Sequence, residues 1–575
     1  MARLYALLGL LSLVFPASAS TDDCRSFPGD ADWPSTKEWA TLNKTVSGRL
    51  VATTPIGSPC HEPNYDAAAC ALIREGWHDP TFHDESSSSI MAPVWTNRSC
   101  DPFTSTDSPC SLGNYVHYAI NVTKPAHIAA GIRFARKHNV RLVIRNTGHD
   151  YLGKSTGAGA LAVWTHRLKN IEHIAKYKGA HSWTGAALKL GAGVQGFEAY
   201  DVAHKLGLQI VGGECSTVGI AGGYTQGGGH SALNSRYGLA ADQVLEWEVM
   251  TADGEVRVAN LKKNKELYWA LSGGGGGTYG IVTAMTVKAH PDSVTTMAKI
   301  SWTHDGSEEQ VAKWWEAVAF FHSLTPGYTD AGAFSVDVYF TGSFSLNPWF
   351  GPGFTAEEAN AQLAPLVERL QELGLQHTVN ITEFSGYLPA YNAAFDYIQV
   401  GIAQYGGRLI PRSLVVNEPQ RLQETLKGII NSGSLIFEVT THPTLEIAGF
   451  PDNAVLPAWR DNQLNLVVTI PWNDTATPAS IIADQQTITN KWGGALRELV
   501  PDSGAYMNEG DPFEPDFKKE FFGINYDRLL RIKDKYDPDQ IFYAITAVGS
   551  DRWATREDGR LCRNDEGKLQ SAVGL

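Results

Sequence analysis

A histidine stands in a glycine-containing turn directly after an apolar segment. Residues 140–144 are apolar and β-branched, which predicts a buried strand. The turn that follows consists of Arg145, Asn146, Thr147, Gly148, His149, Asp150 and Tyr151. Such a turn leaves backbone N–H groups free, and a concave row of amides can hold a pyrophosphate without a lysine. A phosphate loop needs no imidazole, so His149 indicates additional chemistry at the same place.

A cysteine between glycine-rich turns is the second candidate for chemistry. The segment 212–230 contains Cys215, Thr217, Val218, Gly219, Gly222, Gly223, Gly228 and Gly229. The chain has 7 cysteines, and an odd number in an oxidising compartment leaves one without an intramolecular partner. Cys215 is remote from the others in sequence, so we expect it to be the unpaired one. Among the rest, the spacing of Cys100 and Cys110 suggests a local loop, and a bond from Cys562 to the N-terminal region would join the chain ends.

Both segments closely resemble the flavoproteins of the vanillyl-alcohol oxidase / p-cresol methylhydroxylase superfamily, and within it the berberine-bridge-enzyme-like branch. In that branch an R-x-x-G-H turn carries a histidine bonded to the flavin 8α-methyl carbon, and a later G-x-C-x-T-V-G carries a cysteine bonded to flavin carbon 6. His149 and Cys215 fall on these positions, so the resemblance implies a doubly tethered FAD. A G-x-G-x-x-G motif that opens a helix is absent, which argues against a Rossmann NAD site.

Two later segments extend the resemblance. A five-glycine run at 273–277 precedes a strand pattern that contains Ile281 and Val282, which indicates a place where backbone approaches a flat ligand. Near the C-terminus an amphipathic helix begins at Asn525 and is stopped by an Asp-Pro pair. Its pattern is similar to the terminal segment of the berberine-bridge-like branch. The resemblance implies that Ile281, Val282 and Asn525 belong to the cofactor site.

The same resemblance supplies catalytic candidates. Tyr506 and Asn508 match a Y-x-N segment whose tyrosine faces the flavin and acts as a base in several members. A phenol is a weak base at a pKa of about 10, so Tyr506 would need help, and Glu509 is an alternative base. Val218 matches the position that controls access of O2 to the flavin, where a small residue is associated with oxidases. We assign His230 no definite role.

The pattern of elements predicts an α+β protein. The resemblance implies that it consists of a two-part PCMH-type FAD-binding domain and a substrate domain whose antiparallel sheet roofs the flavin. The first domain is expected to open with a β-α-β unit and a second α/β unit, with helices at 125–138 and 194–206. In the second domain we expect strands at 297–302, 333–340 and 464–470, and helices at 308–322, 356–373, 419–429 and 478–497. The predicted segments are a signal peptide at 1–19, a disulfide-rich extension at 20–110, the FAD domain at 111–292, the substrate domain at 293–497, a berberine-bridge-like segment at 498–553 and a tail at 554–575.

The chain begins with a basic residue, an apolar run and an A-x-A site, which predicts a secretory signal peptide. Five N-x-S/T sequons predict N-glycans on Asn43, Asn97, Asn121, Asn380 and Asn473. The formal net charge of −14 argues against nucleic acid or an anionic membrane as a partner. We expect no metal site. A serine run at 86–89 suggests a surface loop.

Four functions remain open. The first is a secreted oxidase that takes hydride from an alcohol carbon and returns electrons to O2 as H2O2. It is suggested by the segments I-R-N-T-G-H-D-Y at 144–151 and A-A-D-Q-V-L-E-W at 240–247, which resemble the fungal isoamyl-alcohol-oxidase group. The second is a tailoring oxidoreductase that acts on a polyketide or alkaloid in secondary metabolism. The third is an oligosaccharide oxidase, which needs an open groove lined by aromatic residues. The fourth belongs to another class, a binding glycoprotein that keeps its flavin without catalysis.

Overall fold

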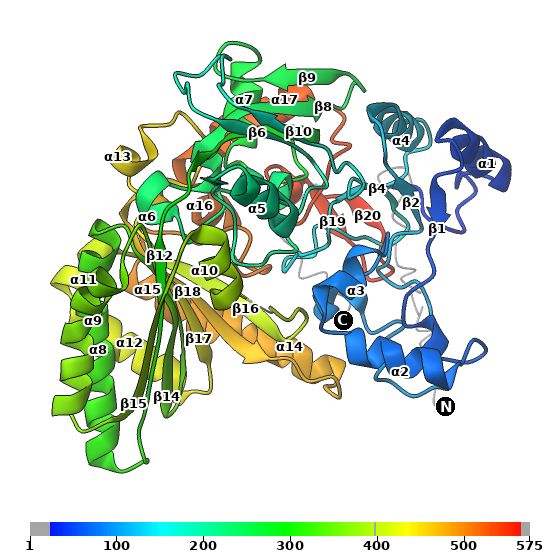
Figure 1. The fold of residues 1–575 in the computed structure, drawn as a ribbon. Helices are drawn as coiled ribbons and strands as arrows, with labels where there is room; N and C mark the ends of the chain where they lie inside the picture. The colour runs from blue at the N-terminus through cyan, green and yellow to red at the C-terminus, as the bar shows by residue number, and fades with distance from the viewer. Residues whose placement is uncertain (1–23, 396–397, 565–575) are drawn as a thin grey trace, which may run out of the picture.

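The computed structural model describes residues 24–395 and 398–564, so the predicted signal peptide lies outside the described residues. The fold is α+β, as predicted, and is built around three sheets of four, five and seven strands within those ranges. Figure 1 shows the seven-stranded sheet with its helices on one side of the molecule and the N-terminal extension on the other.

The first sheet holds the histidine turn. Its strand order is β1 (Leu50–Ala52), β2 (Tyr118–Asn121), β4 (Leu161–Trp164) and β3 (Leu142–Arg145). Helix α4 (Pro125–Lys137) connects β2 to β3, and Pro125 occupies its first turn, where the missing N–H costs nothing. The predicted strand–helix–strand order is confirmed, but β2 and β3 are not neighbours, because β4 pairs in parallel with both.

The second sheet is antiparallel and lies beside the cysteine segment. Its order is β5 (Ile171–Ile174), β6 (Ala187–Gly191), β10 (Ile281–Lys288), β8 (Val244–Met250) and β9 (Val256–Ala259), with helices α5 (Gly196–Lys205) and α7 (Lys265–Leu271) nearby. The strand, helix and strand predicted for the second α/β unit are all present, but its last strand lies in another sheet. After α5 the strand β7 (Leu208–Gln209) pairs with β11 (His290–Pro291) and does not join the sheet of β6.

The third sheet is antiparallel throughout. Its order is β15 (Gln376–Phe384), β12 (Thr295–Thr303), β14 (Ser343–Pro352), β13 (Phe334–Phe340), β17 (Leu435–Thr440), β18 (Asn462–Pro471) and β16 (Ala403–Pro411). Helices α8 (Glu308–Asp330), α9 (Ala356–Glu372), α11 (Arg412–Asn417) and α12 (Pro419–Asn431) cover one face (Figure 1). Trp302, Trp314 and Trp349 are buried in the core between sheet and helices, so they cannot line an open sugar groove.

Several predicted bounds in this region differ from the structure. Helix α8 continues past residue 322 through Pro326. The predicted helix 478–497 is divided into α14 (Pro478–Gln486), a π-helical turn at Thr487–Trp492 and α15 (Gly493–Leu499). Sequence analysis does not predict β14 to β17 or helix α10 (Tyr387–Ala394).

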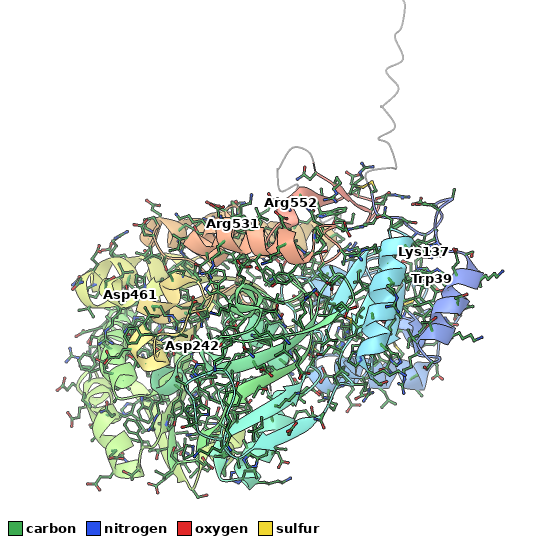
Figure 2. The ribbon with its side chains drawn as sticks, turned by 90° about the horizontal axis from the view of Figure 1, so that it is seen from above. Trp39, Lys137, Asp242, Asp461, Arg531 and Arg552 are labelled. Carbon is green, nitrogen blue, oxygen red and sulfur yellow. A yellow bond between two sulfur atoms is a disulfide. The ribbon has the colours of Figure 1, made fainter. Side chains whose placement is uncertain are left out.

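The N-terminal extension contains three short helices, α1 (Thr36–Thr45), α2 (Ala67–Gly76) and α3 (Pro80–Asp84). Helix α1 packs on α4, where the rings of Trp39 and Phe134 lie 4.5 Å apart between centroids; Figure 2 shows Trp39 beside Lys137 at the end of α4. The serine run is buried from Ser87 to Ser89, so the predicted surface loop is wrong.

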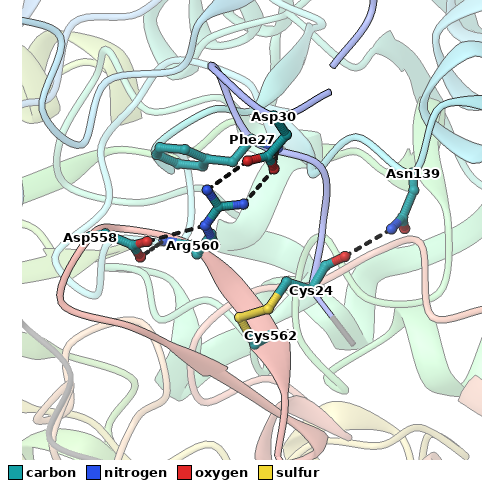
Figure 3. Close-up of a disulfide and its surroundings, with 7 residues drawn as sticks. All are labelled: Cys24, Phe27, Asp30, Asn139, Asp558, Arg560 and Cys562. Carbon is teal, nitrogen blue, oxygen red and sulfur yellow. Dashed lines mark hydrogen bonds and ion pairs between the residues drawn. A yellow bond between two sulfur atoms is a disulfide. The ribbon is translucent and has the colours of Figure 1, made fainter. Parts of the chain in front are cut away.

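Three disulfides fasten the extension: Cys24–Cys562, Cys60–Cys70 and Cys100–Cys110. Figure 3 shows the first beside the ion pair of Asp30 and Arg560, where β20 (Leu561–Arg563) returns to the N-terminal segment. The local loop, the joined ends and the unpaired Cys215 are all as expected.

The C-terminal segment contains α16 (Phe517–Phe522), α17 (Tyr526–Tyr536) and β19 (Trp553–Thr555), and α17 confirms the predicted amphipathic helix. Helix α17 packs against α7, and Cζ of Arg528 lies 3.8 Å from the centroid of the Trp269 ring. None of the described helices combines the length and apolar character needed to cross a bilayer. The described residues contain no cluster of three or more His, Cys, Asp or Glu side chains arranged for a metal ion.

Candidate flavin site

His149 and Cys215 lie next to each other although they belong to separate loops, one after β3 and the other after β7. The Sγ of Cys215 is 3.9 Å from Nε2 of His149, and the hydroxyl of Thr217 is 2.7 Å from that nitrogen and 3.5 Å from the sulfur. Burial, together with His83 and Arg145, lowers the pKa of His149 to about 3, so its imidazole is neutral. Burial raises the pKa of the Cys215 thiol. Two side chains able to bond to a carbon therefore face one place.

The histidine turn is built over a buried guanidinium. Gly148 has φ +94°, and a Cβ at this position would lie 2.7 Å from Nη2 of Arg145. Arg145 donates from Nη2 to the carbonyls of Ser86 and Thr147, while its Nε and Nη1 have no hydrogen-bond partner among the described residues. Burial lowers the pKa of Arg145 to about 10. Arg145 therefore supports the turn and keeps two donor nitrogens for which the described residues supply no acceptor.

Asp84 in the N-terminal extension supports the cysteine segment. The amide of Gln195 donates to Asp84 at 2.5 Å and to the carbonyl of Thr217 at 2.7 Å. Burial raises the pKa of Asp84 to about 7, with the Gln195 hydrogen bond opposing it. The sequence does not mark Asp84, because it lies in a part of the chain without regular periodicity.

One pocket contains most of the predicted site. It encloses about 1510 Å³ of atom-free space, its open mouth included. The predicted residues that line it are Asn146, Thr147, Gly148, His149, Asp150, Tyr151, Cys215, Val218, Gly219, Gly222, Gly223, Val282, Tyr506 and Asn508. The cofactor and catalytic candidates therefore surround one space.

Six predicted residues lie outside this lining. Arg145 and Thr217 contact the lining residues Thr147 and His149 by hydrogen bonds. Gly228 and Gly229 lie in a turn whose carbonyls accept from the N–H groups of residues 241 and 240. Ile281 is fully buried in a neighbouring core. Asn525 donates to the carbonyls of Ala454 and Val455 and is not brought to the pocket.

The pocket wall suits a flat cofactor. A Cβ on Gly223 or Gly277 would meet nothing within 4 Å, so both glycines border open space. A Cβ on Gly276 would lie 2.9 Å from the Cα of Gly223, so the five-glycine run and the cysteine segment meet backbone to backbone. Glycine is the residue that allows such approach. The glycine surfaces together with the neutral imidazole and the thiol fit an isoalloxazine ring.

Further polar groups line or adjoin the pocket beside the alternative base Glu509. His230 contacts Glu214 and Glu509, and all three are lining residues. Lys154 donates to the carbonyl of Met507 at 3.4 Å, and burial lowers its pKa to about 8 against the opposing charge of Asp150. The ring of Tyr405, on β16, stacks on Tyr151 with centroids 4.3 Å apart. The sequence signal for Lys154 is a basic residue three positions after Tyr151, the last residue of the histidine turn. Nothing in the local sequence marks Tyr405.

The fold and this pocket define a flavoprotein, and comparison with known proteins agrees. Residues 116–260 match the family model described as FAD binding domain, and residues 505–549 match the model described as Berberine and berberine like. The chain belongs to the family of FAD-linked oxidoreductases that includes the VAO-type and berberine-bridge-like flavoproteins.

Among its relatives is the FAD-linked oxidoreductase patO of Penicillium expansum, 44% identical over 562 residues, which are 97% of this chain and 97% of that protein. The bifunctional decalin synthase calF of Penicillium decumbens is 43% identical over 97% of this chain and 99% of its own. The crystal structure of the VAO-type flavoprotein MtVAO615 from Myceliophthora thermophila C1 superposes with a TM-score of 0.90 at 40% identity, covering 94% of this chain and 100% of that one.

Proposed function

We propose that this FAD-linked oxidoreductase is an oxidase that takes hydride from an alcohol carbon to give a carbonyl, and that O2 reoxidises it with release of H2O2. The observation that carries the proposal is one pocket that joins the His149–Cys215 pair to Tyr506, Glu509 and His230. In such a site the pair His149 and Cys215 binds and orients the cofactor, and the other three residues handle the hydroxyl proton. FAD, when bound, supplies the hydride acceptor that no side chain can replace.

We propose further that His149 and Cys215 are each bonded to the flavin. Support comes from the closeness of the two side chains, with Sγ of Cys215 3.9 Å from Nε2 of His149, and from the neutral state of His149. Because the Thr217 hydroxyl engages Nε2, we expect Nδ1 to form the bond to the cofactor. Two attachments fix the ring in place and allow an open cleft without loss of the cofactor.

The tethers are tested by denaturing the purified protein in acid and measuring intact mass. We expect a yellow pellet whose mass equals that of the chain plus one FAD. His149→Ala and Cys215→Ala should each keep one attachment and a coloured pellet, whereas the double variant should release its colour. A colourless wild-type pellet with a yellow supernatant would contradict the double attachment.

Oxidase activity, as opposed to dehydrogenase activity, rests on Val218. This residue lines the pocket next to the cysteine, and its N–H donates to the Cys215 carbonyl. A valine leaves room for O2. We expect photoreduced enzyme to reoxidise in air with formation of H2O2, and Val218→Leu to slow that step about tenfold or more. Equal reoxidation rates would remove Val218 from this role.

A second function is supported equally by the relatives. One is named a decalin synthase, so a tailoring role on a polyketide or alkaloid in secondary metabolism fits this family. The oligosaccharide alternative is less favoured, since Trp302, Trp314 and Trp349 are buried in the core. The non-catalytic alternative predicts a flavin that no substrate bleaches.

Anaerobic bleaching distinguishes these alternatives. Purified holoenzyme is mixed with 3-methylbutan-1-ol, benzyl alcohol, propan-2-ol, glucose and cellobiose, and flavin absorbance is followed. Bleaching by simple alcohols supports the proposal, and bleaching by cellobiose alone supports the oligosaccharide oxidase. Bleaching by none of them, with normal reduction by dithionite, would overturn the proposal as stated and leave the tailoring enzyme or the binding protein.

Passage through the secretory pathway is part of the proposal. It is supported by three disulfides and by the exposure of Asn97, Asn380 and Asn473. The amide oxygen of Asn43 accepts from the N–H of Leu50, and Asn121 lies half-buried in β2. We therefore expect glycopeptide mapping of secreted protein to find fuller occupancy at the three exposed asparagines than at Asn121. An unmodified mass would contradict the glycan prediction.

A further inference from the structure

His230 lies between two carboxylates at the pocket wall. Its Nε2 is 2.7 Å from Oε1 of Glu509, and its Nδ1 is 3.3 Å from Oε1 of Glu214. The side chain of His230 is only 6% exposed, compared with 23% for Glu509. Both ring nitrogens therefore face an acceptor, which requires a proton on each of them for both contacts to be hydrogen bonds.

The ring is cationic for a physical reason. Burial alone would lower the pKa of His230, but Glu214 and Glu509 outweigh it and raise that pKa well above its usual value. The other groups around the ring carry no opposing charge: the rings of Tyr506 and Trp459 lie 5.3 and 6.3 Å away, and the hydroxyl of Tyr224 donates to the His230 carbonyl. His230 is a fixed imidazolium in this pocket.

Glu509 is held by donors on both oxygens. Oε1 receives the Nε2–H of His230, and Oε2 receives the side-chain amide of Asn465 on β18 at 3.0 Å. Each oxygen keeps a lone pair, and Glu509 is the most exposed member of the group. The two donors fix the orientation of the Glu509 carboxyl group at the pocket wall.

Tyr506 is less suited to accept a proton. Its hydroxyl accepts from the Asn508 amide at 2.8 Å, but burial and the charge of Glu509 raise its pKa well above the usual value. A phenolate beside a carboxylate is strongly disfavoured. The hydroxyl can orient a substrate by hydrogen bonding, which is a different task.

We propose that Glu509 is the catalytic base of this enzyme and that His230, anchored by Glu214, is the residue that positions it as a carboxylate. The inference rests on the proposed function, oxidation of a CH–OH group. The substrate O–H bond breaks and its proton goes to Glu509, the carbinol carbon loses a hydride to FAD, and a C=O bond forms. The substrate is oxidised by two electrons, and the FAD of this family of oxidoreductases is reduced by two.

The first test compares two candidate bases in the holoenzyme. Glu509→Gln should lower the rate constant for anaerobic flavin reduction by about 10²-fold or more, with no recovery at any pH, since general base catalysis contributes on that scale. Tyr506→Phe should lower it by less than about tenfold. Absorbance of the denatured protein checks that each variant carries its flavin. A Glu509→Gln enzyme that reduces at the wild-type rate would overturn the proposal.

The second test separates positioning from structural damage. His230→Asn should lower the rate at pH 7, and the rate should recover as pH rises, because the carboxylate loses its cationic partner and ionises only at higher pH. The same substitution should cost nothing further in a Glu509→Gln background, because it acts through Glu509. His204→Asn is the matched control: it removes a surface His–Asp pair at 3.4 Å and should change neither rate nor pH profile.

The probes are the five alcohols and sugars named above, and the alcohol that bleaches the wild type fastest is used for all variants. Failure of every probe on wild-type enzyme overturns the proposed function and this inference together. Wild-type bleaching with an unaffected Glu509→Gln enzyme overturns the inference alone. A His230→Asn rate that is low at every pH would remove the positioning role and leave Glu509 as the base.

Discussion

At the scale of residues, the surroundings of two histidines in the pocket set their charge states. Burial makes the His149 imidazole neutral, whereas two carboxylates keep His230 charged. Both histidines follow glycines in the chain, so their local sequences look alike. Their opposite states arise from the residues that the fold places around them.

Asp84 allows a direct test of such an effect. Its folded-state pKa of about 7 lies above the value of about 3.9 in an unfolded chain. The folded state therefore binds the proton more tightly, and this stability is present below about pH 4 and is lost as pH rises through 7. The Asp84→Asn variant has no titrating group at this position, so its stability does not decrease for this reason as pH rises. We expect the Tm difference between Asp84→Asn and wild type to become more favourable to the variant from pH 5 to pH 8, by on the order of 1 °C or more.

The control for Asp84 is Asp107→Asn, a substitution at an exposed loop position. Its Tm difference from wild type should stay constant between the two pH values. A constant difference for Asp84→Asn as well would show that this carboxyl group does not titrate differently in the folded and unfolded states.

At the scale of elements, helices with strong local sequence signals were predicted correctly. A hydrogen bond that compensates for a helix-breaking residue could not be predicted from the sequence. Helices α4 and α17 were predicted because proline and the apolar spacing mark them. The end of α8 was missed, because Pro326 removes an N–H and normally ends a helix. The structure supplies a replacement donor: the hydroxyl of Thr325 donates at 2.8 Å to the carbonyl of His322, four residues before the proline.

Thr325→Val should therefore destabilise the protein. Valine keeps the shape of threonine but leaves a buried carbonyl without its donor, which costs about 1–3 kcal/mol. A lower urea midpoint of unfolding measures the effect. Thr425→Val on α12 removes a hydroxyl bond to the Arg421 carbonyl in a helix whose amides are intact, and its cost should be smaller. Equal midpoints for the two variants would contradict this explanation of α8.

At the scale of the whole molecule, the N-terminal extension is bonded to the C-terminal segment. The Cys24–Cys562 disulfide spans 538 residues of sequence (Figure 3). Beside it the Nη2 of Arg560 donates to Asp30 at 2.7 Å, and Arg25 donates to the carbonyl of Gln540. These contacts bring the N-terminal extension, which carries Asp84 and Ser86, against the histidine turn.

Removing this disulfide should cost more stability than removing a local one. A crosslink restricts the unfolded chain more when it closes a longer loop, and its contribution reaches about 5 kcal/mol. We expect Cys24→Ser/Cys562→Ser to lower the Tm more than Cys60→Ser/Cys70→Ser, whose bond spans 10 residues. Thermal unfolding under non-reducing conditions measures both. An equal or smaller decrease for the long-range pair would contradict the expectation.

The sequence alone determined the cofactor class, the α+β fold and most of the pocket, because His149, Cys215 and their glycines act through local backbone geometry that a motif records. It also determined the unpaired cysteine, since an odd count leaves one over. Only the tertiary structure decided the strand order, the burial of the serine run, the place of Asn525 and the contact of His230 with Glu214 and Glu509. Those depend on segments hundreds of residues apart meeting in space, and the charge of a buried group is set by its neighbours in space and not in sequence.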